Sequence, residues 1–256
     1  MSDPAVTDPT GDFDGDGIPN IVEEATGYDV LKKDNDVFNS ANLFTRQMYR
    51  DMFGREGDPG GLDYWRTMLD SGTVTRVQLV DNMLFGAESR NFEQTVARLY
   101  LACFMRAPDL AGNRYWSNLL GSGVTIEGIA ESFVASDEFT RRYGELNNEQ
   151  FVDRVYLNVL GRFPDQQGRD YWLARLSANV ARSDTISRGQ LLAAFANSDE
   201  YITRIAPTVR VSLIYIALLQ RTPDAAGLDY WTSRAKADGN NQSMIMEFLA
   251  APEYRA

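Results

Sequence analysis

One eleven-residue motif occurs four times in this chain and constrains its fold more than any other feature. The copies run from Arg55 to Trp65, Arg106 to Trp116, Arg162 to Trp172 and Arg221 to Trp231, with spacings of 51, 56 and 59 residues between the arginines. Asp follows each Arg by three positions, Gly by six, and the pair Tyr-Trp by nine and ten. Those residues are Asp58, Gly61, Tyr64 and Trp65; Asp109, Gly112, Tyr115 and Trp116; Asp165, Gly168, Tyr171 and Trp172; and Asp224, Gly227, Tyr230 and Trp231. Self-similarity at this period is typical of a repeated supersecondary unit.

Each copy predicts two helices joined by a turn. Before the Arg, apolar residues recur every three or four positions, as over residues 151–160, which predicts an amphipathic helix. Pro two positions after the Arg, or Gly57 in the first copy, ends that helix. The Asp is then placed to cap a second helix, because its carboxylate accepts the free amides of the first turn.

The recurring Gly and Arg predict close contacts around this turn. Glycine disfavours a helix by roughly 1 kcal/mol relative to alanine, so its recurrence indicates a neighbour too close for a Cβ atom. We expect that neighbour to be the Tyr-Trp pair one turn later. The Arg and the Asp of each copy are three residues apart and are expected to be able to form an ion pair across the turn.

Two further helices complete each copy. In the first, Thr75 is positioned to cap a third helix, and short elements such as Ser136-Asp-Glu-Phe139 and Ser198-Asp-Glu-Tyr201 carry a serine cap before acids. No period-two strand pattern competes. The sequence therefore predicts an all-α protein of four tandem units of helix, turn, helix, helix and short helix, at about 40–92, 93–143, 144–205 and 206–256, preceded by a separate segment, 1–39.

The motif resembles a bacterial repeat family of unknown function found in large secreted, surface-attached and RTX-type proteins. It is more distantly similar to the helical repeat of phycobilisome linker polypeptides. The resemblance covers roughly residues 40–256. It implies an exported protein on the bacterial cell surface or outside the cell, and a chain that is part of a longer protein or a processed form of one.

The sharpest chemical signal precedes the repeats. From Asp12, acids stand at loop positions 1, 3 and 5, Gly at 6, a backbone carbonyl at 7 and Glu at 12, the pattern of an EF-hand-like calcium loop. The candidate ligands are Asp12, Asp14, Asp16, Ile18 through its carbonyl, Asn20 and Glu23. An acidic solvated loop is the alternative, but three alternating aspartates repel one another without a cation. We therefore expect Ca²⁺ here.

A second calcium site is less complete. The segment after Gly27 resembles the start of a second unit in bacterial thrombospondin type 3-like calcium repeats, and this implies Asp29, Asp34 and Asp36 as its ligands. After Asp36 the expected Gly-Asp-Gly is replaced by Val-Phe-Asn. A polar linker with chance acids is the alternative interpretation.

Composition excludes several classes of function. The net charge of -11 argues against nucleic-acid binding, which needs a basic surface. The sequence has no histidine, which excludes Ser-His-Asp and Cys-His catalysis and histidine-ligated metals. The single cysteine, Cys103, lies in an apolar run and is expected to be a buried small hydrophobe. No segment reaches the roughly 18 consecutive apolar residues of a membrane span, and the N-terminus lacks a signal-peptide pattern.

The sequence thus favours a non-catalytic, calcium-binding extracellular module for assembly or attachment, such as a surface-layer, adhesin or matrix component. Its expected partners are proteins, a cell-surface polysaccharide or further copies of itself. The repeated Tyr-Trp and Asp residues also fit a carbohydrate-binding module. Repetition at the same helix position is more typical of a core residue, so we expect the four tryptophans to be largely buried. An enzyme is the least favoured alternative, because no isolated pair of acids stands out.

Overall fold

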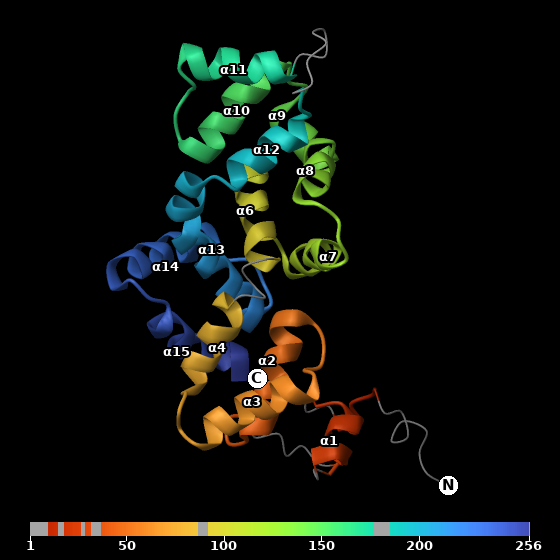
Figure 1. The fold of residues 1–256 in the computed structure, drawn as a ribbon. Helices are drawn as coiled ribbons and strands as arrows, with labels where there is room; N and C mark the ends of the chain where they lie inside the picture. Colours follow the sequence, from red (N-terminus) through yellow and green to blue (C-terminus); the bar gives the residue numbers. More distant parts are fainter. Residues whose placement is uncertain are drawn as a thin grey trace. The chain divides into compact units, whose positions relative to one another are not determined.

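The protein is described here from a computed structural model, which covers residues 10–14, 18–26, 29–31, 37–86, 92–176 and 185–255. Within these ranges the chain forms fifteen α-helices and no strand (Figure 1). The predicted all-α fold of repeated helical units is confirmed. The chain divides into two compact units, residues 1–75 and residues 76–256.

Unit 1 contains the N-terminal segment and the first two helices of the first repeat. Its helices are α1 (Asn20–Thr26), α2 (Ala41–Phe53) and α3 (Pro59–Asp70). Ile18 and Val22 are buried against Leu43 of α2, with Val37 beside them. This small cluster fixes the segment that carries the candidate calcium ligands onto the first repeat helix.

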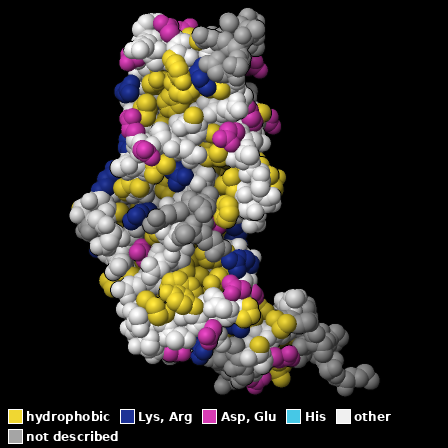
Figure 2. Space-filling model, viewed as in Figure 1, with side chains coloured by type: hydrophobic (Ala, Val, Ile, Leu, Met, Phe, Trp, Pro, Cys, Tyr) yellow, Lys and Arg dark blue, Asp and Glu magenta, His cyan; other side chains and the backbone are white. Residues whose placement is uncertain are grey.

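Unit 2 contains the third helix of the first repeat and the three remaining repeats. Its helices are α4 (Arg76–Phe85), α6 (Glu93–Phe104), α7 (Leu110–Gly121), α8 (Ile126–Val134), α9 (Asp137–Tyr143), α10 (Asn148–Leu160), α11 (Gln166–Leu176), α12 (Arg188–Ala196), α13 (Asp199–Leu219), α14 (Ala225–Asp238), α15 (Gln242–Ala250) and α16 (Pro252–Arg255). Side chains of α6, α8, α9, α10, α12 and α13 share one hydrophobic core. On the face drawn in Figure 2, hydrophobic side chains also gather at the surface over α10 and α11.

The first helix of every repeat ends on a residue in the left-handed region. These residues are Gly54, Met105, Gly161 and Gln220, with φ of 64°, 51°, 69° and 50°. Each stands directly before the motif Arg. A left-handed residue, usually glycine, is a common way to end a helix. Because two of the four residues are not glycine, the sequence pattern did not reveal this shared helix end.

The second helix of every repeat begins at the motif Asp, as predicted. A carboxylate oxygen accepts the amide of the motif Gly at 2.9 Å in the first copy and 2.7 Å in the other three. The predicted serine caps are also present, since Ser136 and Ser198 accept the amides of Phe139 and Tyr201. The helix boundaries thus follow from local hydrogen bonding that the sequence specifies.

Third helices pack in pairs within unit 2. Helix α8 of the second repeat lies against α12 of the third, and α4 of the first repeat lies against α15 of the fourth. The first pair crosses closely at Gly189, where an added Cβ would lie 2.5 Å from the backbone nitrogen of Glu131. The first and fourth repeats, which are not adjacent along the chain, are therefore in contact through their third helices.

The short fourth helix of the third repeat is not separate. It continues into the first helix of the fourth repeat as α13, a 21-residue helix that contains Pro207. By length and composition α13 is the single helix among the described residues that meets the requirements of a membrane span, and half of its most apolar stretch is buried inside the protein. Core helices of soluble proteins meet the same requirements.

Candidate functional site

The candidate calcium loop is held by two hydrogen bonds around Asn20. Its backbone amide donates to the carbonyl of Gly11 at 2.8 Å, and its side-chain oxygen accepts from the amide of Phe13 at 3.0 Å. Ile18 is fully buried, so its side chain anchors the middle of the loop while α1 begins at Asn20. These contacts bring the first and last parts of the loop together.

The acids of this loop differ in exposure. Asp12 is exposed, Asp14 is partly buried and Glu23 is fully buried with 0 % of its surface exposed. Asp16 lies outside the described residues. Within the described part of the chain, no three His, Cys, Asp or Glu side chains form a metal-binding group. A bound cation would compensate the cost of burying the Glu23 carboxylate, which is large for a charged group.

The second candidate site is described only at Asp29. Its carboxylate is exposed and accepts the amide of Leu31 at 3.1 Å, which is the geometry of a local turn. Asp34 and Asp36 lie outside the described residues.

The neighbour of each motif Gly is a tyrosine six residues before the Arg, and not the Tyr-Trp pair that the sequence analysis favoured. These tyrosines are Tyr49, Tyr100, Tyr156 and Tyr215. An added Cβ on Gly112, Gly168 or Gly227 would lie 2.5 or 2.6 Å from the corresponding hydroxyl oxygen. The first helix thus sends a tyrosine across the turn onto the backbone of the second helix, and only glycine leaves space for it.

The motif Arg stacks on the same tyrosine in every copy. Its guanidinium carbon lies 5.1 to 5.7 Å from the ring centroid of Tyr49, Tyr100, Tyr156 or Tyr215. Such cation–π contacts contribute about 0.5–1 kcal/mol at exposed positions. The Arg therefore covers the outer face of the tyrosine whose hydroxyl touches the glycine.

In the second and fourth copies the ion-pair partner of the motif Arg is a glutamate of the short closing element, and not the motif Asp that the sequence suggested. Arg106 binds Glu138 through two hydrogen bonds of 2.7 Å, and Arg221 binds Glu253 at 2.7 and 3.3 Å. The Arg106 guanidinium holds the pKa of Glu138 below its usual range, chiefly through this hydrogen bonding. The motif Asp caps the second helix instead. The glutamate that stands before the closing aromatic residue, as Glu138 and Glu253 do, was available in the sequence to suggest this partner.

The motif Trp points inward. Trp231 is buried, while Trp65, Trp116 and Trp172 are partly buried, so the expectation of four largely buried rings is too strong. In the last three copies the indole lies 5.2 to 5.5 Å from a phenylalanine of the third helix. The hydroxyls of Tyr100 and Tyr215 have raised pKa values because of burial, and a side-chain hydrogen bond with the indole opposes that rise.

The motif Tyr points outward, which repetition alone did not reveal. Tyr64, Tyr115, Tyr171 and Tyr230, called here the outward tyrosines, are 53 to 59 % exposed. Each meets its Trp neighbour edge-on at 4.9 to 5.0 Å. The core residue of each pair is therefore the Trp, and the Tyr is available to a partner.

A family model described as a domain of unknown function, DUF4214, matches residues 34–95, 130–205 and 208–256, nearly three-quarters of the chain. The chain belongs to the DUF4214 family. Neither the comparison with curated proteins nor that with solved structures found a match.

Each matched DUF4214 segment contains one copy of the motif, and the second copy lies outside the matched residues. Its geometry is nevertheless that of the others, because Asp109 caps α7, Arg106 stacks on Tyr100, and the hydroxyl of Tyr100 touches Gly112. The second repeat of this DUF4214 chain therefore has the same local structure.

Cys103 is buried in α6, as the sequence predicted. Burial raises the pKa of its thiol well above the usual value, which keeps the thiol protonated and unreactive at neutral pH. This cysteine is a core residue of unit 2.

Proposed function

We propose that this DUF4214 chain is a non-catalytic, calcium-binding module that attaches an extracellular or cell-surface bacterial protein to a partner. The observation that carries the proposal is the outward tyrosine that recurs at the same motif position in all four copies and is more than half exposed in each. Aromatic side chains with one apolar face and one polar end are enriched in binding surfaces. Four equivalent positions allow weak contacts to add through multivalency.

Calcium has two roles in this proposal. Asp12, Asp14, Asp16, Asn20 and Glu23, with the Ile18 carbonyl, would bind it through oxygen ligands, which calcium prefers. The bound cation would also offset part of the net charge of -11 and so reduce repulsion between acidic surfaces. The proposed partner is therefore a protein, a surface polysaccharide or a second copy of the chain.

A carbohydrate-binding module is the second candidate. An acid stands directly before the outward tyrosine in three copies, as Asp63, Asp170 and Asp229, and all three are exposed. An aromatic face beside a carboxylate suits a sugar ring with its hydroxyls. Arg114 occupies this position in the second copy, so the arrangement is less uniform than the tyrosines themselves.

Sedimentation and pull-down with bacterial envelope fractions test the proposal, each with calcium and with chelator. We expect self-association or retention on the envelope to increase at least severalfold in calcium. A chain that stays monomeric and binds no envelope fraction in either condition would contradict attachment. Substrate turnover that one acidic substitution abolishes would instead show an enzyme.

A further inference from the structure

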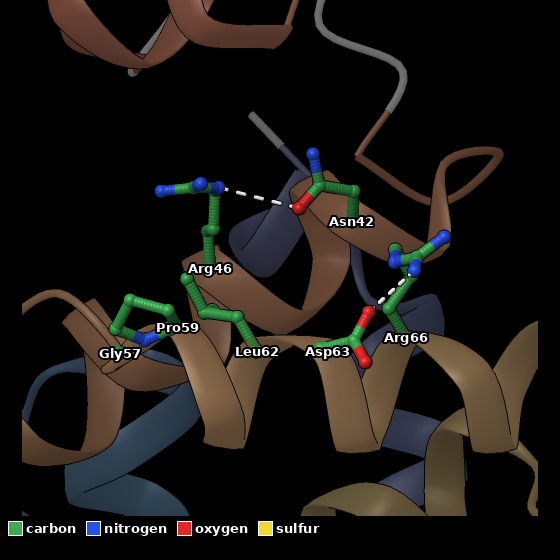
Figure 3. A pocket seen from close by; sticks show the side chains of 7 residues that line it. All are labelled: Asn42, Arg46, Gly57, Pro59, Leu62, Asp63 and Arg66. Atoms are coloured by element: carbon green, nitrogen blue, oxygen red, sulfur yellow. Dashed lines mark hydrogen bonds and ion pairs between the residues drawn. The ribbon is translucent and has the colours of Figure 1, made fainter.

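A pocket of about 390 Å³ opens between α2 and α3 in unit 1 (Figure 3). Its apolar lining is Gly57, Pro59 and Leu62. Its polar lining is Asn42 and Arg46 from α2 with Asp63 and Arg66 from α3. This volume is within the range of small-molecule sites, which combine an apolar surface with a few placed polar groups.

Neighbouring side chains hold both arginines of the pocket in position. The Nε atom of Arg46 donates to Asn42 at 3.3 Å, and its Nη1 atom lies 3.4 Å from Glu56. Arg66 donates to Asp63 at 2.5 Å. Figure 3 shows the Arg46–Asn42 pair and the Arg66–Asp63 pair on two sides of the pocket.

In the third repeat, the positions that correspond to the pocket residues carry ion pairs between the first and second helices. There, Arg169 of α11 reaches Glu149 and Asp153 of α10, at 2.7 Å each. The corresponding residues of the first repeat are Leu62, Asn42 and Arg46. The first repeat thus has a cation where the third has an acid, and a leucine in place of the long side chain that bridges the two helices.

Only the first copy carries an arginine at both pocket positions. The residues that correspond to Arg46 and Arg66 are Ala97 and Ser117, Asp153 and Leu173, and Ser212 and Thr232. The motif around them is the same in all copies, so packing of the repeat does not require these two arginines.

We propose that this pocket binds a sugar unit that carries a carboxylate, a hexuronate. The ligand's carboxylate would bind Arg46 and Arg66, because a guanidinium binds carboxylates with directed hydrogen bonds. Gly57, Pro59 and Leu62 offer an apolar surface to the C–H face of the ring. This inference rests on the proposed attachment function, since it names the class of surface polymer.

The polar lining favours a sugar over an acidic peptide. Asn42 and the exposed carboxylate of Asp63 provide a hydrogen-bond donor and acceptors for ring hydroxyls. A run of peptide carboxylates would meet Asp63 and a chain of net charge -11. One carboxylate per ring, surrounded by hydroxyls, meets less repulsion.

Calorimetric titration of the full chain with D-glucuronate tests this site, with the methyl ester of the same sugar and with glutarate as matched probes. We expect glucuronate to bind, and the ester and glutarate to bind at least tenfold more weakly. Arg46→Gln or Arg66→Gln should weaken glucuronate binding at least tenfold. Arg50→Gln is the matched control, because Arg50 also contacts Glu56, at 3.2 Å, but does not line the pocket, and it should change affinity less than twofold.

Several results would overturn the proposal. These are no glucuronate binding by the unaltered chain, equal binding of the ester or glutarate, or equal losses in Arg46→Gln and Arg50→Gln. Circular dichroism of each variant shows that the helices persist. If the chain binds the envelope fraction but does not bind glucuronate, only the proposed pocket is rejected. If it binds glucuronate but is not retained on any envelope fraction, the attachment function is rejected.

Discussion

Replacing Asp12 and Glu23 together by alanine is expected to abolish calcium binding. The two residues occupy the first and last positions of the loop, where a carboxylate closes the coordination from each end and the final Glu binds through both oxygens. Isothermal titration calorimetry of the double variant should show no binding heat at millimolar calcium. Chelation of the unaltered chain should raise hydrogen exchange mainly before residue 40 and leave α6 to α15 protected.

The single variants Glu23→Ala and Glu24→Ala provide the matched control. The two glutamates are adjacent on α1, but Glu23 is fully buried and Glu24 is exposed. We expect Glu23→Ala to lose at least tenfold in calcium affinity and Glu24→Ala to retain it. An intact chain that binds no calcium at millimolar concentration, or equal effects of the two variants, would contradict the calcium loop.

Trp231→Ala is expected to destabilise the fold by about 3–5 kcal/mol, the usual cost of removing a large buried aromatic side chain. Trp231 is 8 % exposed, lies edge-on to Phe248 at 5.5 Å, and hydrogen bonds with the side chain of Tyr215. Its neighbour Tyr230 is 57 % exposed. Tyr230→Ala should therefore change the free energy of unfolding by less than about 0.5 kcal/mol.

Urea unfolding of the two variants, followed by far-ultraviolet circular dichroism, measures this difference. The substitutions are adjacent and both remove an aromatic ring, so composition and position are matched. If the free energies of unfolding of Trp231→Ala and Tyr230→Ala differ by less than about 1 kcal/mol, the Trp is not the core residue of the pair.

Local hydrogen bonding made much of the fold predictable. The motif Asp, the closing Ser and the apolar periodicity each act within one turn of their own helix, so their roles follow from spacing alone. The helix ends at Met105 and Gln220 were not predictable in this way. Both are left-handed residues without the glycine that usually marks such an end.

Contacts between distant residues were less accessible to sequence reasoning. The approach of Tyr100 to Gly112 depends on how two helices fold back across a turn, and the sequence indicated only that something is close to the Gly. Which member of the Tyr-Trp pair faces inward is set by the third helix, through Phe133, Phe195 and Phe248. The spacing of the motif does not indicate that α8 packs against α12 or that α4 packs against α15.

The division between an inward Trp and an outward Tyr is the central claim of the proposed attachment function. Replacing all four outward tyrosines by alanine should leave the helical signal and the unfolding midpoint nearly unchanged, because Tyr64, Tyr115, Tyr171 and Tyr230 are more than half exposed. Envelope pull-down in calcium tests the claim most directly. The account predicts that this variant is no longer retained while the unaltered chain is, and equal retention of the two folded proteins would contradict it.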